Sequence, residues 1–204
     1  MEMRDRILDG AEELYFRYGV RSVTMDDIAN HLSISKKTIY QHFNDKDDLV
    51  INVMQKHLKN EEITCNELMG GSGNAILHIY NITKYMRNHV ANINPSLLFD
   101  LKKYHSKAFK SYESFKHDYL TKQIEKNLSQ GIEEGFYRKE INIKVITKMR
   151  LALMEMGFDA TVFPPSEFNI VEVQLELFEH FLRGVLTPQG LELLEKYRHE
   201  NENN

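Results

Sequence analysis

Residues 24–49 carry three short apolar patterns with helical spacing, separated by two tight turns. The apolar positions from Met25 to Leu32 fall on one helix face, and Thr24 precedes them as a capping residue. Ser33-Ile34-Ser35 interrupts that helix, and Ser35 can cap a second helix from Lys36 to Phe43. A third begins near Lys46, after a turn. The pattern therefore predicts three short helices with tight turns between them.

The middle helix of the three has one apolar side and one polar side. At about 100° per residue, Ile39 and Phe43 point inward, whereas Lys37 and Gln41 point outward. Lysine donates to guanine or phosphate oxygens, and glutamine pairs with adenine. Thr38 and His42 share the outward side, and Lys36 and Tyr40 lie at its flank. This layout predicts a helix that enters the major groove of DNA, with Lys46 placed to reach the backbone.

The alternative is that the lysines and glutamine form only the solvated face of an amphipathic helix. Net charge does not decide between the two, because residues 1–50 hold seven Lys and Arg against ten Asp and Glu. DNA binding therefore has to depend on a local basic edge and not on a general positive field. The tight turn and the flanking helices favour the DNA-binding interpretation.

Several motifs follow one another in the first 50 residues: Ile7-Leu8-Asp9-Gly10-Ala11 through Phe16-Arg17-Tyr18-Gly19, then 24–32, 38–43 and 46–49. Together they resemble the DNA-binding domain of TetR-type (tetracycline-repressor family) regulators. The resemblance covers about the first 50 residues. It implies an all-α homodimer with an N-terminal three-helix head, a helix-turn-helix, and a C-terminal helical regulatory and dimerisation domain. We expect about nine to ten helices, divided into domains at 1–48 and 49–204.

The resemblance also implies contacts with double-stranded DNA at a palindromic site. Lys36, Lys37, Thr38, Tyr40 and Gln41 would lie at the groove, with Ser35 at the start of the same helix, and Thr24, His42 and Lys46 would lie on phosphates. The function implied is transcriptional regulation, with release from DNA by an unknown small-molecule effector. The resemblance implies a repressor, although the sequence does not distinguish a repressor from an activator of transcription.

The remaining residues carry helical patterns at about 46–69, 74–91, 97–104, 106–134, 143–159, 167–186 and 188–198. An effector pocket in such a body should be apolar and aromatic. The candidates for its lining, each equally suited to the core, are Met86, Phe99, Tyr104, Phe109, Tyr112, Phe115, Met149, Leu153 and Met156.

The last long helix predicts self-association. Apolar residues between Val171 and Leu186 cover an arc of roughly 220°, whereas a helix packed on one core needs little more than about 100°. The excess surface would meet a partner subunit, unless the helix is fully buried within one chain. The predicted interface comprises Leu153, Leu175, Phe178, Phe181, Leu182 and Val185.

Other functional classes find little support. The nine histidines lack metal-ligand spacing, and no hydrolase or metalloprotease motif occurs, so we expect no enzyme, metal or cofactor. A helical enzyme or a small-molecule or metal carrier without DNA binding is the alternative. Cys65 is the one cysteine and excludes an internal disulfide. With no 18-residue apolar run and no signal peptide, we expect a cytoplasmic protein that does not enter membranes.

Overall fold

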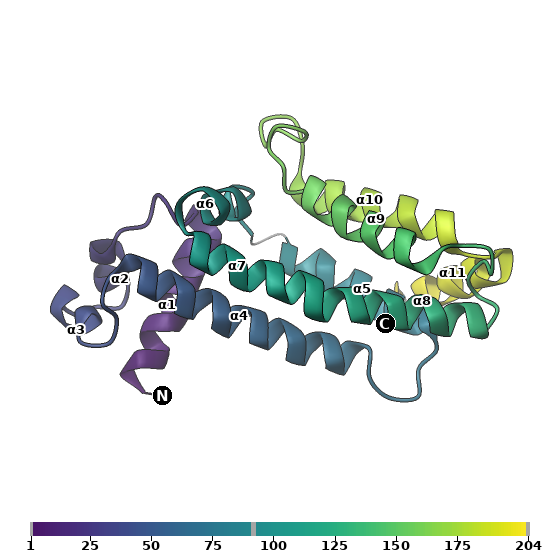
Figure 1. Cartoon of the computed structure of the whole chain (residues 1–204), viewed down its shortest axis with the longest axis horizontal. Helices are drawn as coiled ribbons and strands as arrows, with labels where there is room; N and C mark the ends of the chain where they lie inside the picture. Colours follow the sequence, from purple (N-terminus) through teal and green to yellow (C-terminus); the bar gives the residue numbers. More distant parts are fainter. Residues whose placement is uncertain (1, 91–92, 203–204) are drawn as a thin grey trace. The chain divides into compact units, whose positions relative to one another are not determined.

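The computed structural model describes residues 2–90 and 93–202, and it divides the chain into two compact units (Figure 1). The first unit comprises residues 1–62 and 92–115, and the second comprises 63–91 and 116–204. The described residues are helical apart from turns, loops and one isolated β-bridge, between Tyr137 and Leu186. The all-α prediction is confirmed. The predicted boundary between a DNA-binding domain and a regulatory domain, after residue 48, falls inside the first unit. This division by function stays a prediction.

The first unit contains the predicted head. Its helices are α1 (Met3–Tyr18), α2 (Met25–His31), α3 (Lys36–Tyr40), most of α4 (Lys46–Leu68), α6 (Leu97–Tyr104) and α7 (Ser106–Ser114). One apolar core runs through them, with Ile7, Ile28, Ile39, Leu49 and Leu101 fully buried. Burial of a side chain of this size contributes about 1.5–3 kcal/mol. The short helices are therefore held by packing on α1 and α4 and not by their intrinsic helix stability.

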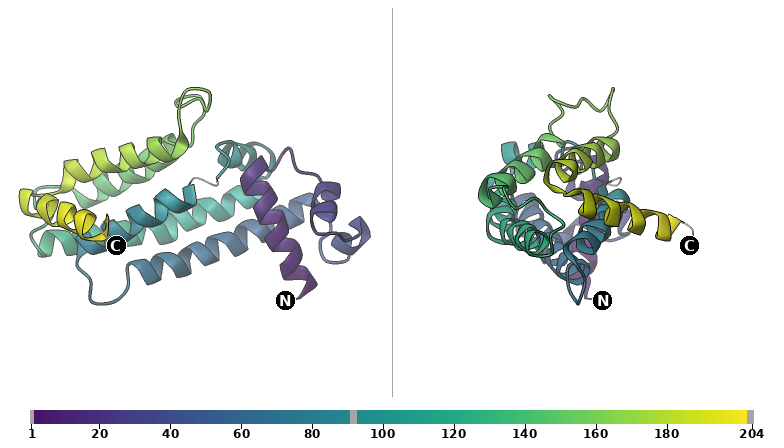
Figure 2. Two further views of the ribbon diagram at one scale, coloured as in Figure 1. Left: turned by 180° about the vertical axis from the view of Figure 1, so that it is seen from behind. Right: turned by 90° about the vertical axis from the view of Figure 1, so that its right-hand side faces the viewer.

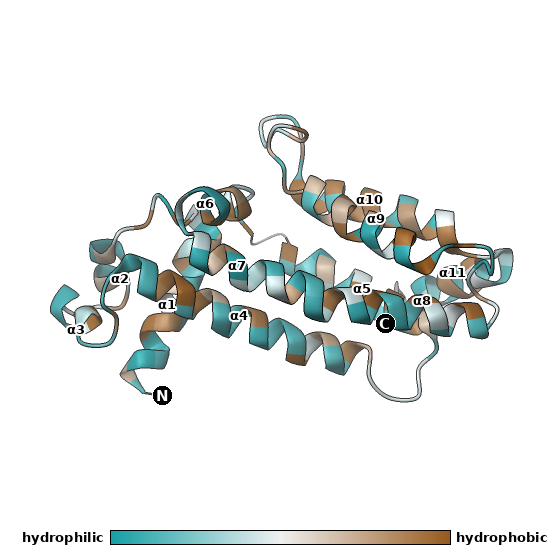
Figure 3. Ribbon diagram, in the orientation of Figure 1, coloured by the Kyte–Doolittle hydropathy of each residue, from teal (hydrophilic) through white to brown (hydrophobic). Residues whose placement is uncertain are grey.

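The second unit contains the end of α4, α5 (Ala75–His89), the π-helical segment η2 (Phe115–Leu120, Phe115 itself belonging to the first unit), α8 (Thr121–Glu133), α9 (Ile143–Met156), α10 (Ile170–Val185) and α11 (Pro188–Glu202). Helices α9 and α10 lie side by side and are joined by the loop 157–169 (Figures 1 and 2). Apolar residues predominate along this pair (Figure 3). Helix α5 packs against α8, α10 and α11, which closes the core of this unit.

Several predicted helix ends are wrong by a few residues. Helix α3 ends at Tyr40 and not at Phe43, because the His42 amide bonds the Ile39 carbonyl in a tight turn that brings Phe43 into the core. Helix α10 begins at Ile170, where the Asn169 side chain accepts hydrogen bonds from two backbone amides. Helix α9 ends at Met156, and α11 extends to Glu202.

Two further boundaries differ from the sequence pattern. The predicted helix 106–134 contains the π-helical turn η2, whose extra residue per turn shifts the apolar face in a way that an α-helical pattern does not reveal. Helix α5 is described to His89, and the predicted end at Ala91 lies outside the described residues. No helix among residues 2–90 and 93–202 is both long and apolar enough to cross a membrane.

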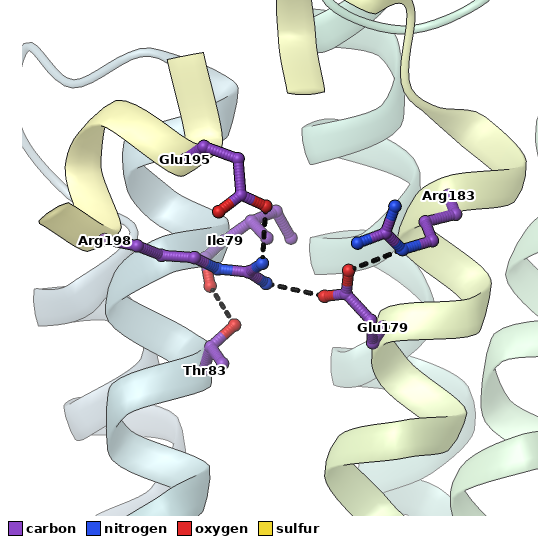
Figure 4. Close-up of polar contacts among 6 residues, drawn as sticks. All are labelled: Ile79, Thr83, Glu179, Arg183, Glu195 and Arg198. Atoms are coloured by element: carbon purple, nitrogen blue, oxygen red, sulfur yellow. Dashed lines mark hydrogen bonds and ion pairs between the residues drawn. The ribbon is translucent and has the colours of Figure 1, made fainter. Parts of the chain in front are cut away.

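Helix α11 covers part of the polar face of α10 through an ion-pair network (Figure 4). Glu179 accepts hydrogen bonds from Arg198 at 2.6 Å and from Arg183 at 2.8 Å. Arg198 also bonds Glu195, at 2.8 Å. The two arginines hold the pKa of Glu179 below its ordinary value although partial burial acts to raise it. The network therefore fixes α11 against the side of α10 that an isolated helical projection assigns to solvent.

Gly131 illustrates how closely the second unit is packed. A Cβ atom at this position would lie 2.2 Å from the Tyr137 ring, whose hydroxyl is fixed by a hydrogen bond of 2.8 Å to Asn127. We expect Gly131→Ala to lower the free energy of unfolding by about 1–3 kcal/mol through overpacking. Gly184→Ala is the matched control, because nothing lies within 4 Å and alanine favours a helix. Urea denaturation should separate the two variants; equal stabilities would contradict this packing.

Candidate nucleic-acid interface

The start of α2 is fixed by a reciprocal capping box. The Thr24 hydroxyl accepts from the Asp27 amide at 3.2 Å, and the Asp27 carboxylate accepts from the Thr24 amide at 2.8 Å and hydroxyl at 2.7 Å. These hydrogen bonds hold the pKa of Asp27 below its ordinary value. The predicted cap is present. Because the Thr24 proton is donated to Asp27, the hydroxyl is not free to donate to a phosphate while the box is closed.

The turn between α2 and α3 needs an unusual backbone conformation. Ser33 has a φ of 53°, in the left-handed region that non-glycine residues rarely adopt. The Ile34 amide bonds the Ala29 carbonyl at 2.9 Å, which ends α2 and reverses the chain. From α1, Arg6 donates a hydrogen bond of 2.6 Å to the Leu32 carbonyl, so the turn is held from outside as well.

Helix α3 begins at Lys36, directly after the capping residue Ser35, and packs on the core through Ile39. The Ser35 hydroxyl accepts from the Thr38 amide at 3.1 Å and contacts the Thr38 hydroxyl at 2.8 Å. Ile39 is fully buried. The predicted cap is therefore present, and the buried side of the helix sets which residues face outward.

The outward face of α3 and the turn after it is exposed, as the helical projection predicts. Lys37, Gln41 and His42 are exposed, and the Tyr40 side chain is 46% exposed. Lys36 forms an ion pair of 2.8 Å with Asp26 at the start of α2, and this contact raises the pKa of the lysine. Lys37 has no ion pair with any residue that the structure describes. These side chains supply the donors that base edges and phosphates require.

Lys46 has a different role from the predicted one. Its ammonium group donates a hydrogen bond of 2.6 Å to the Val20 carbonyl, in the loop between α1 and α2. Partial burial lowers the pKa of Lys46, and the carboxylates of Asp100, Asp47 and Asp27 act in the opposite direction. The side chain thus ties the start of α4 to the α1–α2 loop. Its contact with a DNA backbone stays a prediction that the geometry does not favour.

Residues 94–100 form polar contacts with residues 16–21 that the sequence pattern does not predict. Asp100 is buried and accepts from the Arg21 amide at 3.1 Å. The Asn94 amide bonds the Phe16 carbonyl at 2.6 Å, and its side chain bonds the Arg17 carbonyl at 3.3 Å. One feature of the sequence could have indicated these contacts: Asp100 interrupts the apolar run Leu97–Leu101. An acidic residue among buried apolar residues ordinarily has a polar partner.

The predicted effector-lining residues fall in both compact units. Phe99, Tyr104, Phe109, Tyr112 and Phe115 belong to the first unit, and Met86, Met149, Leu153 and Met156 belong to the second. The side chains of Phe99, Tyr104 and Met149 are 58%, 41% and 41% exposed, so neither unit encloses them. The remaining six are half-buried or buried. Among the described side chains, no three His, Cys, Asp or Glu gather closely enough to hold a metal ion.

The predicted dimer interface needs correction. Phe178, Phe181, Leu182 and Val185 are between 0% and 4% exposed, because α5 and α9 pack against α10 within one chain. Most of the apolar surface of α10 is thus buried within the monomer. Leu153 and Leu175 are only half-buried, and their place at an interface stays a prediction.

The N-terminal segment of the chain is similar to known regulatory proteins. Residues 7–53 match the family described as "Bacterial regulatory proteins, tetR family". The HTH-type transcriptional activator FasR of Mycolicibacterium smegmatis is 37% identical over 59 residues, which are 29% of this chain and 27% of that protein. The chain therefore matches about a quarter of that relative's length.

Two solved structures share the fold over most of the chain. A TetR-family transcriptional regulator from Agrobacterium tumefaciens superposes with a TM-score of 0.76 at 16% identity, covering 90% of this chain and 97% of the other. A regulator from Saccharomonospora viridis in complex with choline gives a TM-score of 0.74 at 17% identity, with the same coverage. All three relatives are described as transcriptional regulators.

Proposed function

We propose that this chain, whose N-terminal segment belongs to the tetR family of bacterial regulatory proteins, is a homodimeric transcriptional regulator that binds a palindromic DNA site. The exposed polar face of α3, held by a capped turn on a buried core, is the observation that carries the proposal. Two such helices in a dimer would enter successive major grooves, about 34–36 Å apart. The protein would act as a repressor in the cytoplasm.

A small molecule would control this binding by favouring one dimer geometry over another. A ligand shifts such an equilibrium only through its different affinities for the two states. The choline complex of the structural relative supports the idea that a body of this fold can hold a small organic molecule. No observation in this chain favours the alternative of a helical enzyme or carrier.

DNA binding can be tested by fluorescence anisotropy with duplexes selected from a random library. A regulator should bind a selected duplex at least about 10³-fold more tightly than an unselected one at physiological salt. The affinity should also fall steeply with salt, because phosphate contacts release counterions. Equal affinity for selected and unselected duplexes would contradict the proposal.

Asp26 should limit the DNA affinity of the head. Asp26→Ala removes a negative charge beside α3 and releases Lys36, so we expect binding about 10-fold tighter at low salt and a smaller gain at high salt. Asp27→Ala changes the charge equally but removes the Asp27 half of the capping box, and should lower the melting temperature. Anisotropy and thermal melting distinguish the two variants; weaker binding by Asp26→Ala would overturn the role given to Lys36.

The second copy would dock on the exposed faces of α9 and α10. Helix α9 exposes Val145, Met149 and Ala152 at helical spacing, and Val145 is 59% exposed. Lys144 and Lys148 flank this apolar stripe, whereas the exposed face of α10 carries Glu172 and Glu176. In a two-fold dimer, α9 of one copy can meet α10 of the other, so the basic and acidic faces are complementary. This surface replaces the buried residues of α10 as the proposed interface.

Met149 gives a direct test of that surface. Met149→Asp should leave the monomer folded, because the side chain is 41% exposed. It should weaken dimerisation by about 10³-fold, since a two-fold interface loses the contact twice and gains two opposed charges. Sedimentation velocity at several concentrations measures this. Ile63→Asp is the control, because Ile63 is 50% exposed on α4; dissociation of both variants, or of neither, would count against the interface.

A further inference from the structure

Arg150 on α9 is a buried cation that pairs with no carboxylate among the described residues. Its residue is 7% exposed, and its guanidinium carbon lies 4.3 Å from the ring centroid of Phe178 and 5.8 Å from that of Phe181, both on α10. Nη2 contacts the Met86 sulfur at 3.9 Å, and Nη1 is buried with no hydrogen-bond partner in residues 2–90 and 93–202. Burial lowers the pKa of Arg150 to about 10, and no carboxylate in the described part of the chain opposes this effect.

This environment does not satisfy a guanidinium group. Arginine is almost never fully buried unless it is paired, because removing its charge from water is costly. The Phe178 ring offsets part of that cost, and a thioether sulfur is only a weak acceptor. One face of the cation is thus stacked while its Nη1 donor is unused. An anion that reached this donor would bind a group that folding has already desolvated.

Thr147 provides a second unused donor on the same side of α9. It lies one turn before Arg150, so the two side chains share a helix face. Thr147 is 1% exposed, and its hydroxyl oxygen is buried with no hydrogen-bond partner in the part of the chain that the structure describes. One hydroxyl and one guanidinium N–H match the two oxygens of a carboxylate.

The surroundings of these donors are apolar and include a movable side chain. Phe178 and Phe181 belong to the buried core of the second unit, and Met86 packs against that core from α5. Met86 is half-buried, and methionine adapts its shape easily because its side chain is unbranched. A ligand that displaces the sulfur from Nη2 would exchange a weak acceptor for a charged one.

We propose that Arg150 and Thr147 anchor the carboxylate of an amphiphilic effector whose apolar part lies among α5, α9 and α10. This inference rests on the proposed function, since it gives the effector of that regulator a chemical class. The acid would bind as its anion, with no covalent change. The alternative that the experiment tests is that Arg150 has only a structural role, stacked on the aromatic rings, and binds no ligand.

The first arm uses the full-length protein and two carboxylate probes, decanoate and phenylbutanoate, below their micellar concentrations. The matched neutral probes are decanol and phenylbutanol. Each carboxylate that fits should raise the thermal midpoint and bind at least about 10-fold more tightly by calorimetry than its alcohol. If neither carboxylate binds more tightly than its alcohol, the proposal is overturned.

The second arm uses variants of the anchor with the carboxylate that binds. Arg150→Met keeps the length of the side chain and removes its charge, so the protein should stay folded, and carboxylate affinity should fall about 10- to 100-fold. Arg150→Lys should retain more affinity than Arg150→Met. Thr147→Val should weaken binding about 2- to 10-fold, and Thr147→Ser should restore it. Lys148→Met is the control, because this cation is exposed on the same helix. Wild-type affinity in Arg150→Met would assign Arg150 a structural role only.

DNA is absent from both arms, so the result is independent of operator binding. If carboxylates bind through Arg150 but no duplex is selected, the proposed regulator is contradicted and the anion site remains. If duplexes are selected and Arg150→Met binds carboxylates normally, only the effector class is contradicted.

Discussion

Leu182→Asp should yield a chain without a cooperative unfolding transition. Leu182 is 1% exposed in the core of the second unit, and its neighbours in this core are apolar. An aspartate there would lose the apolar burial of leucine and place a carboxyl group in an apolar core. Together these changes should cost more than about 5 kcal/mol, which is comparable with the whole stability of a typical domain. Circular dichroism and thermal melting measure the outcome.

Leu175→Asp is the matched comparison on the same helix. Leu175 is half-buried, so this variant should keep its melting transition and affect association instead. A stable, folded monomer from Leu182→Asp would show that Leu182 belongs to an interface after all. Phe178→Glu is less informative, because Arg150 lies 4.3 Å from the ring centroid and can pair with the new carboxylate.

Lys37→Ala should reduce the affinity for a selected duplex by about 10²- to 10⁴-fold. A good base contact contributes about 1–3 kcal/mol, and a dimer on a palindrome loses it twice. Lys37 is exposed on α3 and has no ion pair within the described residues, so its removal should leave the melting temperature unchanged. Anisotropy at fixed salt gives the change in affinity. Binding should become less selective at one base pair in each half-site.

Lys59→Ala is the control for this loss of charge, because Lys59 is exposed on α4 and carries the same formal charge. It should change the affinity by less than about 3-fold. Lys46→Ala should behave differently from both, since loss of the hydrogen bond to the Val20 carbonyl lowers thermal stability as well. Equal affinities of Lys37→Ala and wild type at matched salt would refute the docking of α3 in the groove.

The head could be predicted from sequence because its signals are local. Thr24 and Ser35 cap the helices that follow them, and Ile39 faces the core, since each feature depends on spacing within a few residues. The partners of the cations were not predictable in the same way. Lys46 bonds a carbonyl 26 residues earlier in the chain, and this contact exists only after α1 and α4 have packed.

The body shows where a helical projection fails. The apolar arc of α10 predicted a partner subunit, but α5 and α9 of the same chain already cover much of that arc. The projection measures how apolar a helix is and does not say which chain covers it. Arg150 was missed for a related reason, because a charged residue within an amphipathic helix ordinarily faces solvent.

The central claim, that two copies of α3 read one DNA site, is tested most directly by the half-site spacing in duplexes selected from a random library with purified full-length protein. We expect an inverted repeat whose half-site centres lie one helical turn, about 10 base pairs, or a multiple of this apart. Two chains should bind per site, and the repeat should disappear from selections with Lys37→Ala. Selection of no motif, or of a single half-site bound by one chain, would contradict the claim.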